Sequence, residues 1–110
     1  MINAGEEFRK GFFQLLKTFG GKIIFYKNFN CADSEAIEII GMKNHKKDNS
    51  SIVMFQFPDR IDLQKGDVIQ QNGSNEFWQV YKTEDKIVTD VFVYFNAYVN
   101  RIDADGNQIN

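Results

Sequence analysis

Hydrophobic residues recur with a helical period near the start of the chain and with a strand period after residue 21. In residues 4–19 the spacing between them is four, three, one and three, which places on one stripe Phe8, Phe12, Leu15, Leu16 and Phe19. Asn3 suits the N-cap of a helix and Gly20 suits its end. The pattern therefore predicts one amphipathic helix over residues 4–19.

Six later segments have the alternation and the composition of strands. They are residues 22–27, 35–43, 51–57, 67–71, 76–82 and 88–102. Most connections are short, as between residues 71 and 76, where Asn72-Gly73-Ser74-Asn75 suits a turn, and short connections favour antiparallel neighbours. The predicted fold is mainly β with one N-terminal α-helix: a small antiparallel β-barrel, SH3-like or OB-like, of about six strands. The helix is expected to plug one barrel end or to pack on the barrel's side.

The length of 110 residues fits a single domain, with the helix at 4–19, the barrel at 22–102 and a flexible tail at 103–110. The chain is 43% hydrophobic and has eleven Phe, which is enough for one packed core. No apolar run approaches the roughly 20 residues that span a bilayer, and the N-terminus does not read as a signal peptide. One cysteine excludes an intramolecular disulfide framework and suits a reducing cytoplasm.

The charged and nucleophilic residues do not form a catalytic pattern. We find no nucleophile with a base beside it, no metal-ligand cluster and no phosphate-binding loop, so we expect no enzyme activity, no cofactor, no metal and no small-molecule substrate. The net charge of −2 and the pI of about 5.3 do not favour nucleic acid as a partner. Trp78 is expected in the core, with base stacking as the alternative.

Two segments are candidate partner-binding surfaces. The first is a predicted polar loop whose lysines would meet phosphates or an acidic protein surface, or would simply be solvated; it contains Lys43, Asn44, His45, Lys46, Lys47 and Asp48. The second is the last strand, which is apolar on both faces over residues 91–95. Its side chains opposite the predicted core are Phe92, Tyr94 and Tyr98. Either the N-terminal helix covers these three residues or another subunit does.

The order of segments also resembles a known group. The helix is followed by LLKTFGGKIIFYK and later by FPDRIDLQKGDVIQQNGSNEFWQVYKTE, and the likeness lies mainly in residues 61–67 and 77–80. These stretches are similar to the small β-barrel proteins of tailed phages and prophages in the head–tail joining or head-completion group. The resemblance implies a structural subunit of a closed ring, with two different contact patches and with partners that are copies of itself or other virion proteins. It also implies a location in the host cytoplasm during assembly and then in the virion.

Two other functions stay open at the level of sequence. A small phage-encoded inhibitor that binds a host protein also fits the size and the acidity. An OB- or SH3-like module that binds nucleic acid would use Lys43, Lys46, Lys47 and Trp78.

Overall fold

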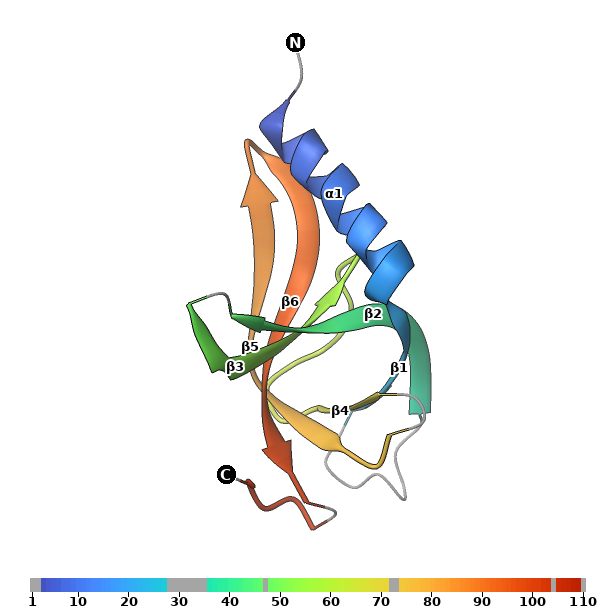
Figure 1. The fold of residues 1–110 in the computed structure, drawn as a ribbon. Helices are drawn as coiled ribbons and strands as arrows, with labels where there is room; N and C mark the ends of the chain where they lie inside the picture. The colour runs from blue at the N-terminus through green and yellow to red at the C-terminus, as the bar shows by residue number, and fades with distance from the viewer. Residues whose placement is uncertain (1–2, 28–35, 47, 72–73, 104, 110) are drawn as a thin grey trace.

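In the part of the chain that the structure describes, one helix is followed by six antiparallel strands (Figure 1). The computed structural model describes residues 3–27, 36–46, 48–71, 74–103 and 105–109. The elements are α1 (Ala4–Phe19), β1 (Gly21–Tyr26), β2 (Ala36–Lys46), β3 (Asn49–Phe57), β4 (Val68–Gln71), β5 (Phe77–Val88) and β6 (Val91–Ile102). The strands close a barrel in the order β1-β2-β3-β6-β5-β4, because β1 pairs with both β2 and β4. The predicted fold class, mainly β with an N-terminal helix and a small antiparallel barrel, is confirmed.

The barrel encloses an aromatic core. Phe55 and Phe57 of β3 are fully buried, and the ring of Phe55 lies 6.2 Å from that of Trp78. Leu63, from the long connection between β3 and β4, is also buried in this cluster. Trp78 is buried as well, which confirms its place in the core.

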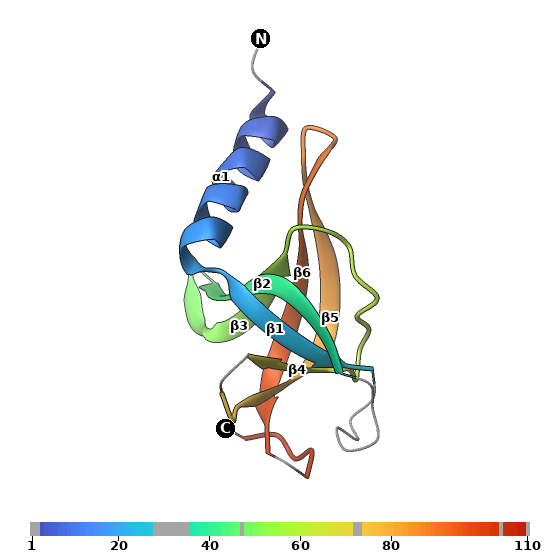
Figure 2. The same ribbon diagram turned by 90° about the vertical axis from the view of Figure 1, so that its right-hand side faces the viewer.

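The β5–β6 hairpin extends beyond the barrel. Strand β4 pairs with only the first residues of β5, Phe77 to Gln79, whereas pairing with β6 continues to Val88. Helix α1 lies along one side of this extension, and the connection 58–67 runs on the other side (Figure 2). The molecule is therefore elongated, with extents of 51 × 29 × 23 Å. No described helix is long and apolar enough to cross a membrane.

Two predicted boundaries on this hairpin were wrong. The structure has one strand to Val88 and a turn at Thr89-Asp90, where the sequence predicted a strand that ended at 82 and another that began at 88. The charged run 84–86 has a weak strand preference by itself, but it pairs along the apolar strand β6. The turn residues have positive φ, 46° and 65°, as a two-residue hairpin turn with the twist of its strands requires.

The prediction of a polar loop at residues 43–50 was also wrong. Strand β2 continues to Lys46 and β3 begins at Asn49, and the pairs Asn44–Met54 and His45–Val53 lie within the ladder. The candidate residues from Lys43 to Lys46 thus lie on a strand, whereas Lys47 lies outside the described residues. Asn72 and Gly73 of the predicted turn after β4 lie outside them too.

The described residues of the predicted tail form a hydrogen-bonded turn. The carboxylate of Asp103 accepts from the backbone amides of Asp105 and Asn107, both at 2.9 Å. These hydrogen bonds, the one from Asn107 most strongly, hold the pKa of Asp103 below its ordinary value. The amide of Ile109 then donates to the carbonyl oxygen of Arg101, so the chain returns along β6.

Candidate functional site

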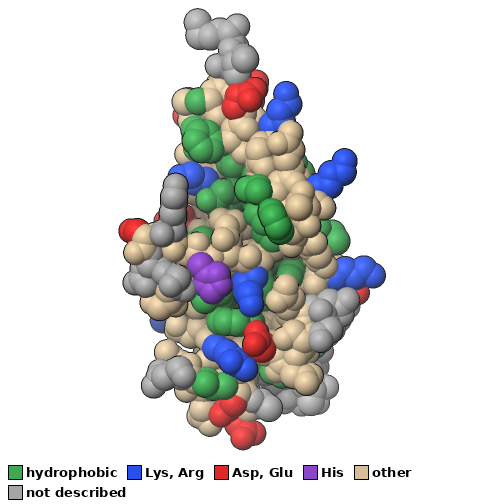
Figure 3. Space-filling model, in the orientation of Figure 1, with side chains coloured by type: hydrophobic (Ala, Val, Ile, Leu, Met, Phe, Trp, Pro, Cys, Tyr) green, Lys and Arg blue, Asp and Glu red, His purple; other side chains and the backbone are tan. Residues whose placement is uncertain are grey.

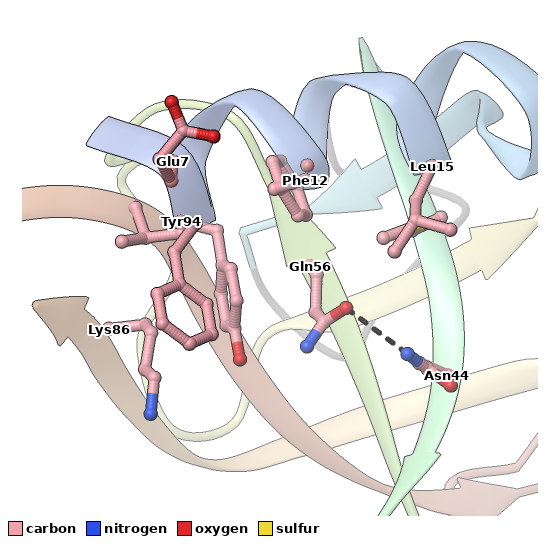
Figure 4. A pocket seen from close by; sticks show the side chains of 11 residues that line it. Glu7, Phe12, Leu15, Asn44, Gln56, Lys86 and Tyr94 are labelled. Carbon is pink, nitrogen blue, oxygen red and sulfur yellow. Dashed lines mark hydrogen bonds between the residues drawn. The ribbon is translucent and has the colours of Figure 1, made fainter. Parts of the chain in front are cut away.

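A groove of about 840 Å³ lies between α1 and the outer face of the sheet (Figure 4). The barrel core occupies the other face of the same strands. The residues that line the groove come from five elements and are Glu7, Phe8, Gly11, Phe12, Leu15, Met42, Asn44, Gln56, Lys86, Val93 and Tyr94.

One wall of the groove is the hydrophobic face of α1. Phe12 is buried, its ring lies 5.0 Å from that of Tyr94, and it forms a small cluster with Leu16, Met42 and Val93. Phe8 and Leu15 belong to the same predicted stripe, yet they are 58% and 49% exposed. The stripe is thus only partly buried in this chain, because the helix packs mainly on a two-stranded hairpin and not on a broad sheet.

The floor of the groove carries polar groups. Gln56, on β3, is only 5% exposed although it is polar. Its side-chain oxygen accepts from the amide of Asn44 at 3.4 Å, and its amide nitrogen donates to the sulfur of Met54 at 3.6 Å. Burial raises the pKa of the Tyr94 hydroxyl, with smaller contributions from Tyr98 and Glu84, while a hydrogen bond with Gln56 acts in the opposite direction. The floor therefore offers amide donors and acceptors beside a neutral phenol.

One cation stands at the rim. Lys86, on β5, is exposed and pairs in register with Tyr94 of β6. It forms no ion pair with any described residue, whereas Lys82, on the same strand, pairs with Glu84 at 3.6 Å. The carboxylate of Glu7 lies on the opposite wall and points away from the floor (Figure 4).

Arg9 holds α1 in the position that forms the groove. Its Nη1 donates to the carbonyl oxygens of Pro58 at 3.0 Å, Phe92 at 3.3 Å and Val93 at 3.0 Å. Its Nη2 lies 3.6 Å from a carboxylate oxygen of Asp59. The guanidinium thus links the helix to β6 and to the end of β3, and sequence reasoning missed it because a lone arginine on a helix usually faces solvent.

The structure separates the residues of the predicted polar loop. Asn44 faces the groove, but Lys43 faces the other side of β2, where its Nζ lies 5.4 Å from the ring of Trp78 and 4.0 Å from Glu76. Neighbouring residues on a strand point to opposite faces, so these side chains cannot form one patch. The backbone amide of His45 donates to the side chain of Asn44 at 2.9 Å, while Lys46 and Asp48 are exposed near the hairpin end.

The three candidate aromatic residues of β6 are also separated. Tyr94 lies in the groove under α1. The ring of Phe92 contacts the guanidinium groups of Arg9 and Arg60, at 5.5 and 4.7 Å from its centroid. Tyr98 lies against Tyr81 instead, with ring centroids 6.2 Å apart. Side chains of α1 therefore contact two of the three, Tyr94 through Phe12 and Phe92 through Arg9.

Sequence reasoning named two groove residues, Asn44 and Tyr94, and missed the others. Gln56 had a visible signal, since it is the polar residue between Phe55 and Phe57 in an apolar strand, which alternation places on the opposite face from the core. Lys86 had no such signal. Among the residues that the structure describes, no group of three or more His, Cys, Asp and Glu could hold a metal ion. Comparisons of the chain with protein-family models, with curated proteins and with solved structures found no match.

Proposed function

We propose that this protein is a non-enzymatic assembly subunit that acts through protein–protein contacts, and that its contact surface is the exposed part of the hydrophobic face of α1. The observation that carries the proposal is the exposure of large hydrophobic side chains on one short helix. Phe19 is 71% exposed, and Phe8, Leu15 and Phe13 are exposed as well. Contiguous exposed hydrophobic side chains are typical of surfaces that a partner covers.

The position of this face suits such a role. Helix α1 stands on the hairpin outside the barrel, so a partner can reach it without contact with the barrel core (Figure 2). Hydrophobic side chains reach the surface in the half of the molecule that contains α1 (Figure 3). The resemblance to head–tail joining proteins of phages supplies the proposed setting, a closed ring of identical subunits or a contact with another virion protein.

The test is the mass in solution, measured by light scattering over a concentration series. For the unchanged protein we expect a defined oligomer above the monomer mass of 12.8 kDa. Phe19→Glu should shift the population toward the monomer, because a charge buried in a hydrophobic contact is desolvated without a partner. Lys17→Glu, a larger change of charge at an exposed position in the same helical turn, should leave the oligomer intact.

Circular dichroism and thermal unfolding of both variants establish that they fold. A monomer at every concentration, or equal behaviour of the Phe19 and Lys17 variants, would contradict the proposal.

A further inference from the structure

We propose that the groove under α1 binds an extended segment of a partner protein in which a hydrophobic side chain is next to a carboxylate. This inference rests on the proposed function and deepens it, because it states the chemistry that the partner must supply.

The size and the walls of the groove define the hydrophobic part of this segment. A volume of about 840 Å³ falls in the range of pockets that bury a compact organic ligand, roughly 300–1,000 Å³. Phe8 and Leu15 on α1 and Tyr94 and Met42 on the sheet all line this space. Because Phe8 and Leu15 are about half exposed, one large aliphatic or aromatic side chain placed between them would remove their hydrophobic surface from water.

The floor of the groove suits a peptide group. The side chains of Asn44 and Gln56 are primary amides, and each has donors and an acceptor. A peptide bond offers one donor and one acceptor at a similar spacing, so an extended backbone above these amides can exchange hydrogen bonds with them. The contacts of Gln56 with Asn44 and Met54 are long, 3.4 and 3.6 Å, so a peptide group can replace them with stronger hydrogen bonds.

The cation at the rim determines which charge on the bound segment is favoured. Lys86 lines the groove and has no ion-pair partner in the described part of the chain. The nearby carboxylate of Glu84 is paired with Lys82, and that of Glu7 points away from the floor. A carboxylate beside the inserted side chain would therefore meet an unpaired ammonium, whereas a lysine at that position would meet a like charge.

Blocked dipeptides test this chemistry without any assembly step. The probes are N-acetyl-phenylalanyl-aspartate amide and the matched amides in which asparagine or lysine replaces aspartate. Binding is followed in proton–nitrogen correlation spectra of the full chain, through the side-chain amide signals of Asn44 and Gln56. We expect these signals to move, and we expect the aspartate probe to bind about two- to fivefold more tightly than the asparagine probe, as one exposed ion pair allows.

Two matched pairs of variants assign the effect to the groove. Lys86→Glu should reverse the preference so that the lysine probe binds best, whereas Lys65→Glu, the same change of charge at an exposed position outside the groove, should preserve it. Gly11 lines the groove, and a Cβ at Gly11 would meet no atom within 4 Å. Gly11→Leu should therefore fill the groove and abolish the shifts, whereas Gly11→Ala should retain them.

The outcomes separate this inference from the proposed function. No movement of the Asn44 and Gln56 signals, or a preference that Lys86→Glu leaves unchanged, overturns the inference even if the protein forms oligomers. Selective binding of the aspartate probe by a protein that remains monomeric supports the inference and contradicts the assembly role.

Discussion

The backbone amide of Gly5 donates a hydrogen bond to the side-chain oxygen of Thr89, 2.9 Å away in space and 84 positions away in sequence. The same amide donates to Asn3, the N-cap of α1, at 2.7 Å, and the Thr89 hydroxyl also donates to Asn3. The first turn of the helix and the tip of the β5–β6 hairpin thus share one hydrogen-bond network. This contact fixes one end of α1 over the sheet and thereby one end of the groove.

Gly5→Ala should loosen this contact. A Cβ at Gly5 would lie 2.0 Å from the carbonyl oxygen of Val88, so the helix must move away. We expect the free energy of unfolding, measured by urea denaturation, to fall by about 1–3 kcal/mol, as overpacked sites do. Gly11→Ala is the control, because that site is open, and it should raise the free energy of unfolding by about 0.5–1 kcal/mol. Stabilisation by both changes would show that Gly5 does not contact the hairpin closely.

Arg9→Lys should weaken the second attachment of α1. Lysine retains the charge but lacks the planar guanidinium that reaches the carbonyl oxygens of Pro58, Phe92 and Val93 together. We expect the free energy of unfolding to fall by about 1.5–3 kcal/mol, the range for hydrogen bonds to a charged group. Lys10→Met changes an exposed residue beside it and should alter the same quantity by less than about 0.5 kcal/mol. A loss no greater than that of the control would contradict this role of Arg9.

Asp90 tests the hairpin turn. Its φ of 65° is left-handed, a conformation that aspartate adopts at less steric cost than a β-branched residue such as valine. Asp90→Val should therefore lower the free energy of unfolding by about 1–2 kcal/mol, which a lower melting temperature would report. Asp90→Gly should lower neither quantity. Equal loss in both variants would point to a role of the carboxylate and not of the backbone.

Tyr94 should dominate the alkaline behaviour of the groove. Burial raises the pKa of its hydroxyl, so folding favours the protonated phenol. Its contribution to stability is complete below the ordinary pKa of tyrosine, about 10, and is lost as the pH rises from there through the higher pKa of the folded state. An ultraviolet titration that follows tyrosinate absorbance should show one late step, that is, one tyrosine that ionises at a higher pH than the others.

Tyr94→Phe should remove this late step and reduce the loss of stability at alkaline pH. Tyr81→Phe, at a more exposed position, should leave the step in place. If the late step persists in Tyr94→Phe, another tyrosine is responsible for it.

Much of the secondary structure could be predicted from the sequence, because it depends on residues that are close together along the chain. The period of Phe12 and Leu16 indicates a helix, Asn3 does cap it, and the alternation in β1 and along residues 93–99 of β6 marks hydrophobic side chains that are buried. The boundaries that were wrong lie in residues 43–46 and 83–88, where charged and polar side chains have little strand preference. Pairing with an apolar neighbouring strand decides their conformation there.

The groove could not be read in the same way. Its residues come from α1, β2, β3, β5 and β6, and they meet only because the helix docks on a hairpin that extends beyond the barrel. That docking depends on a close approach at Gly5 and on the hydrogen bonds of Arg9 to distant carbonyl groups. Periodicity shows that α1 has a hydrophobic face, but long-range contacts decide which part of that face is buried and which part stays exposed to a partner.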